Sequence, residues 1–324
     1  MTDNWVEMHR VKSLTPSMSH PDIDYHQRAK RYRNTPYLFK KLNDSVAYFG
    51  LSTFALDETQ MDNLTDSLQA YFDFPYLIMD LRNNSGGDAI VEDKMLTYFL
   101  NKPSIDTKPY SLVNKPGKFH SFQYCLNYDS SMIIFPDAIK APDGNGYVLP
   151  SQTNRQTIPD SILNYKGKLY LLTGEGTISA ASTFAAELIR NHRAVSVGRE
   201  TASGYHFVTA FKFADIRLPH SYISIRIPLV KSVFDTSITA RTPEGRGLMP
   251  DYPVPLSYEE VMVSKEDIIL NHTLQLISQG KYLGENPFSS IDKPSKQRKS
   301  FPWIPIGCCF LATYLIFFDN GKKK

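Results

Sequence analysis

A serine at the predicted start of a helix is the first residue of this sequence that could do chemistry. Ser179 follows the glycine-rich stretch Gly174-Glu175-Gly176. Apolar residues at four-residue spacing from Ala180 to Ile189 predict a helix that begins directly after it. At a helix N-terminus the dipole favours a developing negative charge, and the N–H of Ala180 can donate to an oxyanion. The same position also suits a serine that only caps the helix, which is the commonest role of serine there.

Two adjacent glycines, Gly86 and Gly87, end a polar segment that begins at Asp80, within a short apolar run. Glycines at the carboxyl end of a strand allow a sharp turn and leave backbone N–H groups facing the crevice. Such groups can bind a phosphate or the oxyanion of an acyl-transfer intermediate. A tight strand-to-helix turn without a ligand is the simpler interpretation. The segment has neither glycine-rich nucleotide-binding motif.

A third polar segment runs from Glu244 to Asp251 and contains two glycines and a proline. Taken alone, it is a turn-rich loop with an acidic residue.

The elements around these segments alternate between strand and helix. A capping box of Asp57 and Gln60 predicts a helix start. Strands are expected at 46–51, 76–81, 168–172 and 194–197, exposed strands at 207–213 and 222–230, and helices from Asp57, at 89–100, at 179–192 and at 257–279. This alternation favours an α/β domain with a largely parallel sheet.

The polar segments, in this order, resemble the tail-specific (C-terminal processing) protease family, including the core of tricorn protease. Residues 80–87 resemble its "DLRxNxGG" segment, and 177–182 its "T-x-S-[AS]-[AS]" turn. Residues 193–201 are similar to the strand and loop that follow, and 247–254 to its "G-[VL]-x-PD-x-x-V" ending. The resemblance covers roughly residues 44–280. It implies a mostly parallel sheet with flanking helices, of the Clp protease/crotonase type, and serine peptidase activity.

The resemblance assigns roles to particular residues. Ser179 falls on the family's nucleophile. A backbone N–H of the Gly86-Gly87 turn, together with that of Ala180, falls on the oxyanion hole. Glu244 matches a glutamate of the tricorn-like branch, which orients the base or binds substrate.

This sequence departs from the family at the residue expected to act as general base. The tail-specific branch places a lysine about 25 residues after the serine, where this chain has Gly204. His206 is the best candidate within the chain, because on an extended strand it faces the same side as residue 204; an ordinary surface histidine is the alternative. His20, which follows a serine, is a weaker candidate, and His192 suits a helix C-terminus.

Composition and the segments outside the core narrow the class of protein. Hydrophobic residues are 42% and charged residues 21% of 324, which is ordinary for a globular protein. The net charge of +3 is too small to argue for a nucleic-acid partner, and we expect none. Three cysteines make no disulfide framework or metal spacing, and no cofactor is implied.

Several segments lie outside the expected core. Residues 1–43 are expected to be a polar linker or the remnant of an upstream module, 102–165 a long insertion or lid, and 281–300 a basic linker. The uncharged run 301–318 is close to the length that spans a bilayer. It is either a C-terminal membrane anchor or an apolar tail.

We therefore expect a serine peptidase that acts on a peptide or protein substrate through an acyl-enzyme at Ser179. The resemblance suggests an extracytoplasmic setting. A non-catalytic peptide- or ligand-binding module on the same fold is a rival interpretation, supported by the missing lysine. A truncated, inactive peptidase homologue is another.

Overall fold

The computed structural model describes one folded unit, which begins at Pro36. It describes residues 36–105, 110–113, 138–140, 147–149, 156–235, 237, 239, 242–264 and 266–282. The run 301–318, His20, the three cysteines and most of the two predicted linkers lie outside these residues. Within the described part of the chain, no helix has the length and apolar character needed to cross a membrane.

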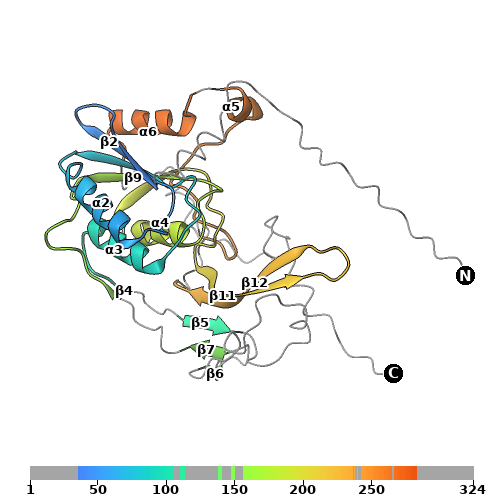
Figure 1. Ribbon diagram of the computed structural model, residues 1–324. Helices are drawn as coiled ribbons and strands as arrows, with labels where there is room; N and C mark the ends of the chain where they lie inside the picture. Colours follow the sequence, from blue (N-terminus) through green and yellow to red (C-terminus); the bar gives the residue numbers. More distant parts are fainter. Residues whose placement is uncertain are drawn as a thin grey trace, which may run out of the picture. The chain divides into compact units, whose positions relative to one another are not determined.

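A six-stranded sheet forms the centre of the fold (Figure 1). Its order is β1 (Tyr37–Lys41), β2 (Val46–Leu51), β3 (Tyr76–Asp80), β9 (Lys168–Thr173), β10 (Ala194–Gly198) and β13 (Tyr252–Pro253). Only β1 runs antiparallel to its neighbour; the other pairs are parallel. The expected α/β architecture with a mostly parallel sheet is thus confirmed. The prediction that residues 1–43 are a linker is wrong for residues 37–41, because these form β1, the edge strand of this sheet.

In the described part of the chain, five helices accompany the sheet, and side-chain caps start four of them. They are α2 (Glu58–Gln69), α3 (Ala89–Phe99), α4 (Ala180–Arg190), α5 (Tyr258–Met262) and α6 (Ile268–Ser278). The capping box of Asp57 and Gln60 is present as predicted. The helix expected over 257–279 is two helices, because Asp267 starts α6 by accepting the N–H of Leu270.

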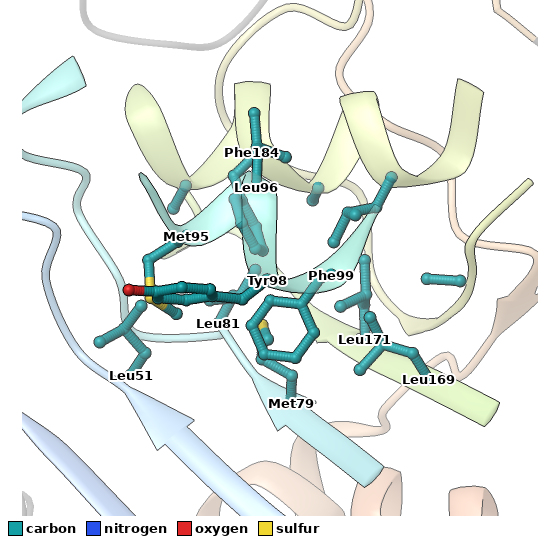
Figure 2. Packing of buried hydrophobic residues seen from close by; sticks show 14 of the residues in the cluster. Leu51, Met79, Leu81, Met95, Leu96, Tyr98, Phe99, Leu169, Leu171 and Phe184 are labelled. Carbon is teal, nitrogen blue, oxygen red and sulfur yellow. The ribbon is translucent and has the colours of Figure 1, made fainter. Parts of the chain in front are cut away.

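Apolar side chains alternate between the two faces of the sheet, as a period of two residues requires. One face packs against α2, α3 and α4, and Figure 2 shows Phe99 and Phe184 of two helices packing toward Met79 and Leu171 of the sheet. The other face packs against α6. A sheet covered on both faces explains why its central strands read as continuous apolar runs.

A second, five-stranded sheet is antiparallel. It has the order β11 (Phe207–Arg217), β12 (Ser224–Val233), β5 (Tyr110–Val113), β7 (Tyr147–Leu149) and β6 (Ile139–Lys140). A two-residue pair, β4 (Ser104–Ile105) with β8 (Gln156–Thr157), completes the strands of the described residues. The predicted insertion 102–165 therefore supplies strands to both small sheets, and at its end Tyr165 is fully buried in the main core.

An arginine and two aspartates tie α6 to the carboxyl end of β3. Arg82 donates to Asp80 and to both carboxylate oxygens of Asp267, the N-cap residue of α6. Tyr48 donates to Asp80 from β2, at 2.7 Å. Burial opposes the charge on Arg82, but the two carboxylates outweigh burial and raise its pKa above the usual value. The "DLR" of the first motif is thus a structural clamp.

We predict that Arg82→Ala lowers the free energy of unfolding by about 3 kcal/mol, because it leaves the buried carboxylate of Asp80 without its cation. Urea denaturation of the two proteins measures the change. Asp215→Asn is the control, because the ion pair of Asp215 with Arg226 lies on the surface, and it should leave stability unchanged. An Arg82→Ala protein as stable as the control would contradict the clamp.

Candidate active site

The three loops that carry the sequence motifs start at the same edge of the main sheet. The glycine turn, the serine turn and the segment 193–201 end in loops after β3, β9 and β10, which are parallel neighbours. The fourth segment, 247–254, contains β13, which pairs with β10. In open α/β sheets this edge, at the carboxyl ends of the strands, is where ligands bind. The fold therefore brings segments separated by about a hundred residues into one place.

Ser179 has a backbone conformation that is rare for a residue with a side chain. Its φ is 54° and its ψ is −127°, and it is the residue directly before α4. Its hydroxyl makes no capping hydrogen bond to the helix, so the simple interpretation as an N-cap is wrong. Conformations of this kind are strained and concentrate at functional sites. A sharp strand-to-helix turn of this sort exposes the hydroxyl of nucleophilic serines.

The glycine turn packs directly against the serine turn. Gly86 has a φ of 92°, and a Cβ atom on it would lie 2.7 Å from the Cβ of Ser179 and 2.9 Å from the N of Ala180. A Cβ on Gly87 would lie 2.1 Å from the N of Ala55. Both positions therefore exclude every residue except glycine, for reasons of space as well as φ.

The predicted oxyanion donors divide into one that is occupied and two that are free. The N–H of Gly86 donates to the side-chain oxygen of Asn84 at 2.9 Å, and is therefore not available to a substrate. Within the described residues, no acceptor is recorded for the N–H of Gly87 or of Ala180. Among the predicted donors, Gly87 and Ala180 are thus the residues whose N–H groups are left for an oxyanion, and Ala180 lies at the positive end of the α4 dipole.

Hydrogen bonds fix the serine turn to both neighbouring loops. The N–H of Ile178 donates to the carbonyl of Asn84, and the hydroxyl of Thr177 to the carbonyl of Leu81, each at 2.9 Å. From the other side, the N–H of Ala202 donates to the carbonyl of Thr177 at 3.1 Å. The serine turn is therefore held between two loops.

The family's lysine position is closed in this chain. A Cβ on Gly204 would lie 2.8 Å from the carbonyl oxygen of Phe207 and 3.4 Å from its ring. Gly204 also pairs with Gly247 in an isolated antiparallel bridge. A side chain at this position would therefore collide with the backbone of Phe207.

The structure does not bring His206 to Ser179. The His206 side chain is buried, and its two ring nitrogens lie 3.1 Å from the carbonyl oxygen of Asp235 and 2.7 Å from that of Thr242. Neither nitrogen is available to accept a proton from a serine in this arrangement. Its role as base is therefore a prediction that this conformation does not support.

Glu244 lies on an exposed turn, and no hydrogen bond of its side chain is recorded among the described residues. The anchored glutamate of this region is Glu200, which accepts from the side chain of Arg246 and from the N–H of Gly247. The hydrogen bond from Arg246 lowers the pKa of Glu200, so Glu200 stays ionised at neutral pH. The structure thus brings Glu200, rather than Glu244, into the bonded network beside the site.

Two further motif residues hold the site's framework, and sequence reasoning assigned neither of them a role. Asn84 is fully buried and also donates to the carbonyl of Leu51. Asp251, from the "PD" of the last motif, accepts from the N–H and the hydroxyl of Ser196, each at 2.8 Å. The positions of Asn84 and Asp251 inside the motifs indicate that they matter to the site, but sequence spacing does not reveal the groups to which they are hydrogen-bonded.

The family model of peptidase family S41 matches residues 45–254, which is more than half of the chain. The chain belongs to peptidase family S41. The matched range contains the glycine turn, Ser179 and the "PD" ending, and the family is one of peptidases. Among curated proteins, none matches this S41 chain significantly.

Solved structures of low identity are similar to this S41 chain. A candidate peptidase from Parabacteroides merdae is 17% identical with a TM-score of 0.48, over 78% of this chain and 70% of that one. Mature CPAF is 16% identical with a TM-score of 0.48, over 75% and 54%. The photosystem II D1 C-terminal processing protease is 15% identical with a TM-score of 0.41, over 68% and 48%. The chain thus spans about half the length of the last two.

We predict that Gly204→Lys will not supply a base in this S41 chain and will destabilise it by about 1–3 kcal/mol, the usual effect of overpacking. The rate of labelling by a fluorophosphonate and the unfolding free energy measure the two effects. Ala202→Lys adds the same charge at an exposed position of the same loop and should change neither. A tenfold or greater rise in labelling by Gly204→Lys would show that the position is open.

Proposed function

We propose that this chain is a serine peptidase that hydrolyses peptide bonds of a peptide or protein substrate through an acyl-enzyme on Ser179. The observation that carries the proposal is the Ser179 turn: a strained backbone, a hydroxyl that caps nothing, and a helix N-terminus beside it. Membership of a peptidase family supports the reaction class.

In the proposed reaction the Ser179 oxygen attacks the scissile carbonyl carbon, whose oxygen becomes negatively charged. The N–H groups of Gly87 and Ala180 donate to that oxygen, which removes part of the barrier. Collapse of the tetrahedral intermediate releases the amine and leaves an ester on Ser179, which water then hydrolyses.

The attack also requires an acceptor for the hydroxyl proton of Ser179. No side chain of the described residues is recorded as hydrogen-bonded to that hydroxyl. This observation favours a second candidate function, a non-catalytic module that holds a peptide at the same edge of the sheet. The closed position at Gly204 supports the same alternative.

We predict that a fluorophosphonate will label the purified protein and that Ser179→Ala will abolish the labelling and any peptide hydrolysis, because the probe bonds only to an activated hydroxyl. Mass spectrometry of the labelled peptide locates the adduct. Ser278→Ala, which removes an exposed hydroxyl of α6, should label like the wild type. Saturable peptide binding by a wild-type protein that never labels would instead establish the binding module.

A further inference from the structure

A second serine contacts the backbone of the proposed nucleophile. The N–H of Ser179 donates to the hydroxyl oxygen of Ser203 at 2.7 Å. Ser203 lies on the loop after β10, one residue before the closed position at Gly204. It is the one side chain of the described residues that is recorded as hydrogen-bonded to the N–H of Ser179.

Among the described residues, no second acceptor is recorded for this N–H. The residue before a helix has no intrahelical partner for its own N–H. The hydroxyl of Ser203 therefore satisfies a donor that the strained turn would otherwise leave unpaired.

Ser203 is held firmly enough to act as an anchor. Its carbonyl accepts from the hydroxyl of Thr201 at 3.1 Å, and that hydroxyl accepts from the N–H of Leu248 at 2.9 Å. The loop is fixed at its start as well, because the N–H of Arg199 donates to the carbonyl of Thr173 at 3.0 Å. Ser203 thus links Ser179, through hydrogen bonds, to the loop after β10 and to the 247–254 segment.

We propose that Ser203 is a positioning residue for Ser179. By holding the Ser179 N–H, it maintains the backbone conformation that exposes the nucleophilic oxygen and leaves the neighbouring N–H of Ala180 free for the oxyanion. The inference rests on the proposed function, and it assigns a role to the loop in which the family's lysine is absent. Ser203 does not itself touch the substrate in this role.

The test compares Ser203→Ala and Ser203→Thr with the wild type, well below their melting temperatures. We expect Ser203→Ala to lower the maximal rate of fluorophosphonate labelling about 100-fold, the effect of a misplacement of about 1 Å, with the probe's binding constant unchanged. Ser203→Thr keeps the hydroxyl and should label within a few-fold of the wild type. Ser67→Ala removes a half-buried hydroxyl that donates only within α2, and it should match the wild type.

Hydrogen exchange at the Ser179 amide provides a readout that does not depend on activity. It should accelerate at least tenfold in Ser203→Ala and not in Ser203→Thr. Wild-type labelling rates and unchanged exchange in Ser203→Ala would overturn the inference while leaving the proposed function intact. A wild type that is not labelled, with exchange accelerated in Ser203→Ala, would overturn the proposed function and show that the contact is only structural.

Discussion

The close approach of two turns, at Gly86 and at Ser179, is the constraint on which the candidate site depends. The two backbones are so near that no side chain fits at residue 86. Because of this contact, the glycine turn and the start of α4 lie side by side although they come from different segments. Ser179 can hold its strained conformation only because the surrounding loops enforce it, since an isolated residue would relax to a normal φ.

The parallel sheet makes that approach possible. Neighbouring parallel strands end at the same edge, so the loops after β3, β9 and β10 meet there even though the chain between β3 and β9 includes the 102–165 insertion. Several residues of the motifs hold the framework rather than the substrate. Arg82 fastens α6, Asp251 fastens the last strand to β10, and Asn84 shapes the glycine turn.

The sequence predicts the parts of the fold that local patterns determine. Continuous apolar runs mark the buried strands, and the capping box of Asp57 marks α2. The sequence does not predict the edge strand β1, because YLFKK is short and mostly exposed and has two lysines at its end. The division of 257–279 into two helices depends on Asp267, whose carboxylate also binds the distant Arg82, and no local pattern reveals that contact.

The site is predictable to the same extent. The order of the motifs predicts Ser179 and the glycine turn. It does not predict which N–H groups of that turn are already hydrogen-bonded within the protein, as the N–H of Gly86 is to Asn84. His206 is a candidate base only if the chain is extended from Gly204 onward. Instead β11 begins at Phe207, so the alternation of strand faces does not apply to residues 204–206. The bond between Ser179 and Ser203 joins a backbone N–H to a side chain, which sequence spacing cannot indicate.

A crystal structure of the fluorophosphonate adduct would locate the nucleophile and the oxyanion donors together. We expect phosphorus bonded to the oxygen of Ser179, with the phosphonyl oxygen about 2.7–3.1 Å from the nitrogens of both Gly87 and Ala180. An adduct on another residue, or a phosphonyl oxygen that points into solvent away from both N–H groups, would contradict this expectation.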